Sequence, residues 1–157
     1  ASLRACGVEG EACKQCAEGF ECSRGGDCVV PDGSRWDVVA VESTIVQSTV
    51  NVDRTSGPDQ RLEMTVGDSS GKTSVAKDTY RATWNEVVVE GVRARGLKKE
   101  ASYTPWDNDL HGQEKIVADC KPGFTDEDFA NKKTSHTCIG GASARSRAEI
   151  LFRLVPK

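Results

Sequence analysis

The chain has 157 residues, a net charge of −3 and 37% apolar residues, which suits one globular domain with a small addition. No apolar run approaches the roughly 20 residues that a transmembrane helix requires. The slightly acidic balance gives no reason to expect a nucleic acid as a partner. We therefore expect a protein without a transmembrane segment and without nucleic-acid binding.

Cysteines are concentrated at the beginning of the chain. Five of the seven fall within the first 28 residues, among glycine and charged residues: Cys6, Cys13, Cys16, Cys22 and Cys28. Such a stretch has too little apolar material for a core, so we expect disulfides to hold residues 1–32 as a small knot. Two bridges among these five cysteines would leave one thiol, with the connectivity open. The first residue, Ala1, agrees with a mature form, and we expect a secreted, periplasmic or cell-surface location.

The segment "CKQC" (residues 13–16) also has the spacing of zinc ligands or of a redox dithiol. A zinc site would need a second pair of ligands at similar spacing, and the sequence contains no second CxxC or HxxxH pair. A redox dithiol would follow a strand and begin a helix, and neither pattern is present. Disulfides are therefore favoured over both alternatives.

After a turn-rich linker, "VVPDGSR", short β-branched or alternating segments are separated by Gly, Asp and Ser. This pattern predicts an all-β sandwich over residues 33–157, with one short amphipathic helix within 125–133. The expected strands, in chain order, are 36–41, 61–66, 72–76, 84–90, 99–104, 114–118 and 148–155. The alternation places these side chains on the inner faces: Trp36, Val38, Leu62, Met64, Val75, Val87, Val89, Ile116, Ile150, Phe152 and Leu154.

Two acidic clusters flank the expected strands. "TPWDNDLHG" carries Asp107 and Asp109, and "VDRTSGPDQ" carries Asp53 and Asp59. Such clusters are typical of solvated turns. Loops from different hairpins, however, gather at one end of a sandwich, where four carboxylates would repel one another unless hydrogen bonds or a cation offset the repulsion. We predict that these four aspartates converge as a calcium site or the remnant of one.

Residues 36–119 resemble C2 domains, the calcium- and phospholipid-binding β-sandwiches. The resemblance rests on an ordered series: the strand "WDVVAV", the D-x5-D pair at 53 and 59, "GKTSVAKDTYRATWNEVV" and "WDNDLHG". It implies an eight-stranded antiparallel Greek-key sandwich, here preceded by the disulfide-rich segment. It further implies calcium as the cofactor, the same four aspartates as its ligands, and an anionic lipid surface or a protein as the partner.

The chain departs from the family pattern at several positions. Gln60 and Arg61 follow Asp59 in place of Pro-Tyr, and Pro105 stands where the family has the first aspartate of its third calcium loop. Three alternatives therefore stay open: weak calcium binding, binding of a single calcium ion, or loss of calcium binding. "AEILFRLVP" resembles the closing strand of the family. Cys120 and Cys138 would bracket an insertion before it, where a disulfide would staple the fold.

The features above favour a binding module over an enzyme. The two histidines, His111 and His136, stand in no G-x-S-x-G or similar catalytic context. We expect no catalytic residue and a secreted or surface module that engages a membrane surface or a protein, with or without calcium. The alternative is a structural subunit of an extracellular assembly that docks through the cysteine-rich segment without metal.

Overall fold

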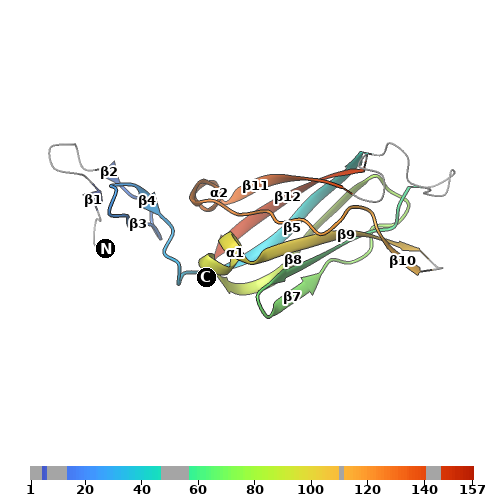
Figure 1. Cartoon of the computed structure of the whole chain (residues 1–157), viewed down its shortest axis with the longest axis horizontal. Helices are drawn as coiled ribbons and strands as arrows, with labels where there is room; N and C mark the ends of the chain where they lie inside the picture. The colour runs from blue at the N-terminus through green and yellow to red at the C-terminus, as the bar shows by residue number, and fades with distance from the viewer. Residues whose placement is uncertain (1–4, 7–13, 47–56, 110–111, 141–145) are drawn as a thin grey trace.

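The computed structural model describes residues 5–6, 14–46, 57–109, 112–140 and 146–157. In this part of the chain, two four-stranded antiparallel sheets pack against each other as a sandwich (Figure 1). The first sheet has the order β10-β9-β6-β7: β6 (Gln60–Val66), β7 (Ser69–Lys72), β9 (Ala101–Asp109) and β10 (Gly112–Lys115). The second has the order β11-β12-β5-β8: β5 (Arg35–Val46), β8 (Arg81–Arg93), β11 (Lys133–Ile139) and β12 (Arg147–Pro156). The prediction of an eight-stranded antiparallel sandwich is confirmed.

Most of the predicted core is buried between the two sheets. Leu62, Val38, Ile150 and Phe152 are 0% exposed, because they lie on the inward rows of β6, β5 and β12. Val75 is only half-buried. Among the described residues, no helix is both long and apolar enough to cross a membrane.

The prediction that Val87 is buried is wrong, and β-bulges in β8 explain why. Val38 pairs with Val89 and Val39 pairs with Val87, so Val88 is an extra residue opposite β5. Because an extra residue shifts the alternation by one, Val88 is buried and Val87 is 52% exposed. Two further register shifts in this pairing lie near Asn85 and Gly91, whose φ angles are 58° and 59°.

Several elements differ from the sequence-based expectation, for example β10, which covers residues 112–115 where a strand was expected at 114–118. β7 covers residues 69–72, earlier than expected, and Gly71 allows it to approach β8, because a Cβ there would lie 1.8 Å from the Val88 carbonyl oxygen. A short helix, α1 (Ala94–Lys99), stands where a turn was expected. β11 was not predicted, since "KTSHTCI" has few apolar residues, yet it pairs with β12 along its whole length.

The "KT" and "WNE" landmarks of the resemblance hold the segment between β7 and β8. The Thr73 N–H donates to the Leu62 carbonyl at 2.9 Å, and the Thr73 hydroxyl oxygen accepts from the Leu62 N–H at 3.0 Å. Glu86 accepts hydrogen bonds from the backbone N–H and the hydroxyl of Ser74. These landmarks therefore serve the fold itself.

The N-terminal segment forms two small ribbons, one of β1 (Ala5–Cys6) with β2 (Lys14–Gln15) and one of β3 (Glu21–Cys22) with β4 (Cys28–Val29). A disulfide joins Cys16 to Cys28, and Cys22 is also disulfide-bonded. Figure 1 shows this segment extending from the end of the sandwich that carries α1 and α2 (Asp126–Asn131).

Val30 attaches this segment to the sandwich. It is 2% exposed and belongs to the hydrophobic core, and its N–H donates to Asp126 Oδ1 at 2.7 Å. The same oxygen accepts from Lys98 Nζ at 2.8 Å. Asp126 therefore links the incoming chain, α1 and α2 at a single point.

Another disulfide joins Cys120 to Cys138, which is the pair expected from the sequence. Cys120 forms a β-bridge with Tyr103 of β9, whereas Cys138 belongs to β11 of the other sheet. The bond therefore connects a segment bound to one sheet with an edge strand of the other.

Candidate functional site

Two of the predicted aspartates meet where β6 begins and β9 ends, a region that we call the loop end. The Asp59 N–H donates to Asp107 Oδ1 at 2.9 Å, across 48 positions of sequence. The Asn108 N–H donates to the Asp59 carbonyl, and the Asp78 N–H donates to Asp59 Oδ1, both at 2.9 Å. Both carboxylates are thus held by backbone N–H groups.

The segment that carries Asp107 is a strand and not a turn. β9 continues to Asp109, which pairs with Gly112 of β10, so residues 104–109 lie on a strand that pairs with β10. Asp107 occupies the same inward row of β9 as Tyr103 and is 9% exposed. Its carboxylate therefore lies over the end of the core, where it meets Asp59.

A buried polar network that the sequence did not reveal supports the loop end from below. The Ser43 hydroxyl donates to Gln60 Oε1 at 2.8 Å, and Gln60 Nε2 donates to the Thr79 carbonyl at 2.6 Å. Gln60 is 1% exposed and Ser43 0%. Because Ser43 lies on β5 and Gln60 on β6, this network ties the two sheets together beneath Asp59. The sequence could not predict this role of Gln60, because a single glutamine at the start of a strand does not indicate its partners.

The chemistry of this site fits calcium, but the described ligands are too few. Carboxylate oxygens are the hard donors that Ca²⁺ prefers, and a calcium ion takes 6–8 oxygen ligands. Among the described residues, no group of three or more His, Cys, Asp or Glu side chains could hold a metal ion. Asp53, His111 and the side chain of Asp109 lie outside the described part of the chain. The structure therefore joins two of the four predicted residues, Asp59 and Asp107, through a backbone-to-side-chain hydrogen bond.

Asn108 is directed to the outer face of the sheet. Its side-chain oxygen accepts from Arg61 Nη1 and from Gln113 Nε2, both at 3.1 Å. Arg61, only 8% exposed, also pairs with Glu63 at 2.7 Å. The Asn108 amide oxygen is thus occupied by a surface network.

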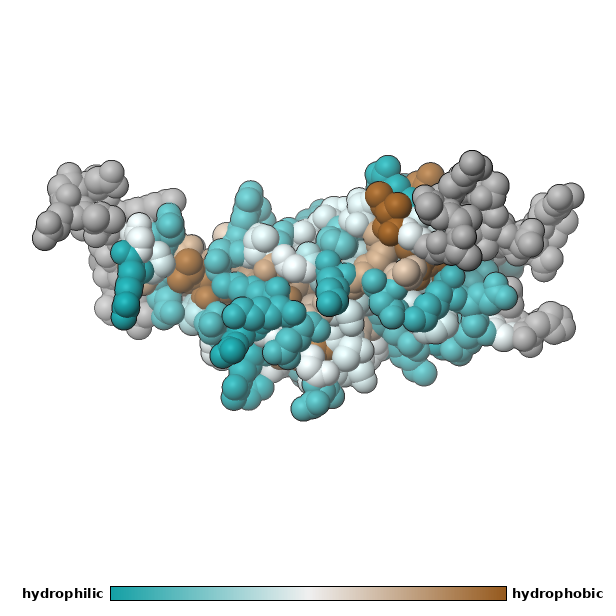
Figure 2. All heavy atoms as spheres, in the orientation of Figure 1, coloured by the Kyte–Doolittle hydropathy of each residue, from teal (hydrophilic) through white to brown (hydrophobic). Residues whose placement is uncertain are grey.

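Exposed apolar side chains also gather at the loop end. Val46 at the end of β5 is 48% exposed, Ile139 at the end of β11 is 69% exposed, and Tyr80 is 41% exposed. Val46 and Ile139 lie on either side of Arg147 across three paired strands. Figure 2 shows apolar atoms on the surface at this end. Such a patch is typical of a surface that contacts a membrane or another protein.

His136 packs between the two sheets. Its Nδ1 lies 2.6 Å from the Tyr103 hydroxyl oxygen. Burial lowers the pKa of His136 and raises the pKa of Tyr103, which keeps both groups neutral. His136 thus packs against Tyr103 and lies on the same strand, β11, as the disulfide-bonded Cys138.

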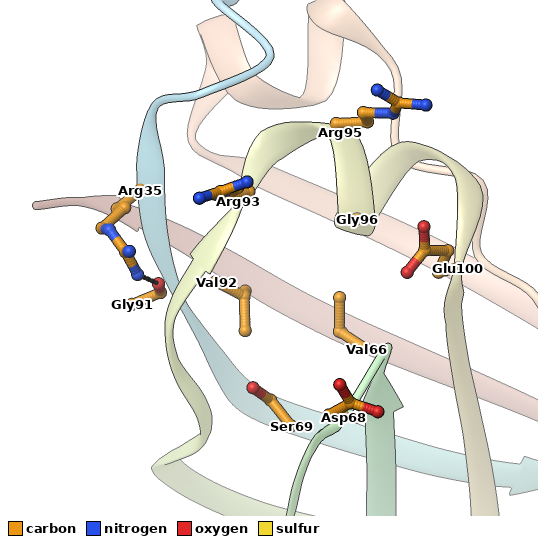
Figure 3. A pocket seen from close by; sticks show the side chains of 10 residues that line it. All are labelled: Arg35, Val66, Asp68, Ser69, Gly91, Val92, Arg93, Arg95, Gly96 and Glu100. Carbon is orange, nitrogen blue, oxygen red and sulfur yellow. Dashed lines mark hydrogen bonds between the residues drawn. The ribbon is translucent and has the colours of Figure 1, made fainter.

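A pocket of about 480 Å³ opens at the opposite end, beside α1, which we call the helical end. Figure 3 shows Arg35 and Arg93 on one side of it and Asp68 and Glu100 on the other. Local sequence patterns do not reveal this pocket, because its residues come from three separated stretches of the chain.

No family model and no curated protein matches the sequence. Solved structures, however, share its fold. The first (A) C2 domain of plant extended synaptotagmin 1 superposes with a TM-score of 0.54 at 16% identity, over 81% of this chain and 98% of that domain. A structure of a C2 domain gives a TM-score of 0.53 at 12% identity, over 78% of this chain and 98% of that one.

The calcium-bound pair of C2 domains, A and B, of extended synaptotagmin 2 gives a TM-score of 0.53 at 14% identity, over 80% of this chain and 46% of that one. The resemblance inferred from the sequence is therefore confirmed at the level of the fold: this chain has the C2-like β-sandwich.

Proposed function

We propose that this chain is a binding module whose loop end binds calcium and, through it, an anionic membrane surface. The observation that carries this proposal is the hydrogen bond from the Asp59 N–H to the Asp107 carboxylate, which places these two aspartates next to each other at one end of a C2-like sandwich. Backbone N–H groups hold both carboxylates, so the acceptors are already in place before a ligand arrives.

Asp59 and Asp107 would hold the cation together with Asp53 and Asp109, the remaining aspartates predicted from the sequence. Calcium would supply positive charge at a surface where carboxylates otherwise gather. The protein residues position the carboxylates, and hydrogen bonds from N–H groups reduce their repulsion. The calcium-bound state of one structural neighbour supports this assignment.

A membrane is favoured over a protein partner by the exposed apolar side chains at the same end of the sandwich as the aspartates. Val46, Tyr80 and Ile139 are all exposed near the same end of the sandwich. Apolar groups that enter the bilayer interface would add to the electrostatic attraction of anionic lipid. A protein partner remains the alternative outcome of the binding test below.

The calcium proposal is tested by thermal melting of the wild type and of Asp59→Asn and Asp107→Asn. Asparagine keeps the oxygen that accepts the backbone N–H and removes only the charge. At a hundredfold excess of calcium over the dissociation constant, we expect about 2.7 kcal/mol of stabilisation in the wild type. Both variants should lose most of it, whereas Asp68→Asn at the helical end should keep it. An unchanged wild-type melting curve in millimolar calcium would contradict the proposal.

The membrane proposal is tested by co-sedimentation with phosphatidylserine vesicles, with calcium and with a chelator. We expect calcium-dependent binding that falls in Ile139→Asn and is retained in Val87→Asn, which removes an exposed valine from the middle of β8. A protein that binds calcium but no vesicle would point to a protein partner instead.

The second candidate function is a structural subunit that docks through the N-terminal segment. It is favoured by the position of that segment, which extends beyond the sandwich and contains the Cys16–Cys28 disulfide (Figure 1). We propose an oxidising location, secreted, periplasmic or at the cell surface, for either function. A covalent dimer or larger species on a non-reducing gel, lost on reduction, would support the structural role. A monomer in both gels would contradict a covalent assembly.

A further inference from the structure

The pocket at the helical end is formed by segments that the fold brings together from distant parts of the chain. Its walls come from the start of β5, the turn between β6 and β7, the end of β8 and α1 (Figure 3). Its volume of about 480 Å³ lies within the usual range for small-molecule sites. This pocket is separate from the loop end and from the function proposed for it.

Opposite charges occupy opposite walls of the pocket. Figure 3 shows Arg35 and Arg93 on one side, Asp68 and Glu100 on the other, and Val66 and Val92 between them. Both valines are 6% exposed, so they form a buried apolar floor. Arg95 lines the rim and points away from the other side chains.

These charges are not satisfied by one another. Among the described residues, Arg93, Asp68 and Glu100 make no side-chain hydrogen bond or ion pair, although all three line the same pocket. Arg35 donates one hydrogen bond to the Gly91 carbonyl at 2.7 Å, which holds its guanidinium in place while leaving further N–H groups available. The walls therefore present separated positive and negative groups across an apolar floor.

Glycines shape this arrangement. A Cβ on Gly96 would lie 3.0 Å from Val66 Cγ1, so the absence of a side chain lets α1 lie close to the floor. Gly91 has φ +59° and redirects β8 just before Val92 and Arg93. The pocket thus depends on backbone geometry that other residues would disturb.

We propose that this pocket binds a small zwitterion, with its phosphate or carboxylate at Arg35 and Arg93 and its amine at Asp68 and Glu100. A planar guanidinium suits oxyanions because it donates two parallel N–H groups. Carboxylates suit an ammonium group, and the carbon atoms that join the two charges lie over Val66 and Val92. A purely anionic ligand would face the two carboxylates, and a purely cationic ligand would face the arginines.

Calorimetric titration of the whole chain without calcium tests the proposal, with O-phosphoethanolamine as the zwitterionic probe. Two control compounds share only one of its charged groups: inorganic phosphate has the negative group, and ethanolamine has the positive ammonium group. We expect the zwitterion to bind at least about tenfold more tightly than either half, because both walls contribute charge-assisted hydrogen bonds. Equal affinity for phosphate alone, or no binding of the zwitterion, would overturn the proposal.

Charge-removing variants locate the site. Arg93→Gln and Glu100→Gln should each lower the affinity for O-phosphoethanolamine by about tenfold. Arg153→Gln removes an exposed arginine outside the pocket and should leave the affinity unchanged. Melting curves verify that each variant is folded, and unchanged affinity in folded Arg93→Gln or Glu100→Gln would overturn the proposal.

Two further binding measurements distinguish whether the zwitterion is a free small molecule or a lipid headgroup. β-Alanine carries a carboxylate and an amine and represents a free small molecule. Phosphatidylethanolamine vesicles without calcium represent a lipid headgroup. Binding of either that depends on Arg93 supports the site and identifies its source. Because all arms omit calcium, their failure would leave the function proposed for the loop end unaffected.

Discussion

Charged residues lie at both ends of this sandwich, but those of the loop end and those of the helical-end pocket differ in their hydrogen bonds. At the loop end, Asp59 and Asp107 accept hydrogen bonds from backbone N–H groups of Asp78 and Asp59. At the helical end, Arg93 and Glu100 line a pocket and make no side-chain contact of this kind within the described residues. The loop-end carboxylates are thus already oriented by the fold, whereas the side chains of Arg93 and Glu100 are oriented by no hydrogen bond or ion pair of this kind among the described residues.

The supports beneath the two ends also differ. The loop end rests on the polar pair of Gln60 and Ser43, whereas the helical end rests on aromatic packing around Phe129. The rings of Phe129 and Trp36 lie 5.0 Å apart, and those of Phe129 and Phe124 6.5 Å apart. Damage to one support should therefore leave the other end in place.

The largest expected effect comes from Phe129→Ala. Phe129 is 0% exposed, and its removal leaves a cavity beneath α2, so the free energy of unfolding should fall by about 3–5 kcal/mol. Urea denaturation measures the loss. A loss below about 1 kcal/mol would mean that the site collapses readily and that α2 contributes little to the helical end.

An intermediate effect is expected from Asp126→Ala, which removes the acceptor shared by Val30 and Lys98. The buried Val30 N–H is left without its partner, which costs about 1–3 kcal/mol. We expect faster amide exchange at Val30 and faster proteolysis of the N-terminal segment. Glu127→Ala, on the same turn of α2 and exposed, is the matched control. Equal exchange in both variants would show that Asp126 does not hold this segment.

Much of the fold was predictable because burial imposes alternation on most strands. The inward rows of β6 and β12 follow the apolar pattern of Leu62, Met64, Ile150 and Phe152. For β8 the prediction that Val87 is buried was wrong, because a bulge reverses which residues face inward. Such a bulge leaves little trace in the amino-acid composition. β11 was missed for a related reason: its inward row includes His136, whose burial depends on Tyr103 of the other sheet.

The candidate site was only partly predictable. Asp59 and Asp107 were identified because acidic residues beside strand ends are visible in a sequence. Their hydrogen bonds were not, since these depend on β9 continuing to Asp109 as a strand. The pocket at the helical end requires the relative placement of three separated segments, which local patterns do not contain.

The smallest expected effect lies between the two ends, at His136. Burial lowers the pKa of His136 in the folded protein, so the unfolded chain binds a proton more readily. Stability should be complete above the unfolded pKa of about 6.5 and should decrease as the pH falls below it. His136→Gln should have a shallower pH dependence of the urea midpoint between about pH 7.5 and 5, a window that brackets that pKa. Identical slopes would show that burial does not affect protonation at this position.

The central claim is that calcium acts at the loop end and not at the helical end. Amide ¹H–¹⁵N spectra recorded during a calcium titration test it most directly, since the N–H groups of Asp59, Asp78 and Asn108 all bond to Asp59 or Asp107. We expect these three amides to shift at millimolar calcium or below, the range of extracellular modules. The amides of Arg93 and Gly96 should stay unchanged. Three unmoved loop-end amides at this concentration, or shifts confined to Arg93 and Gly96, would contradict the claim.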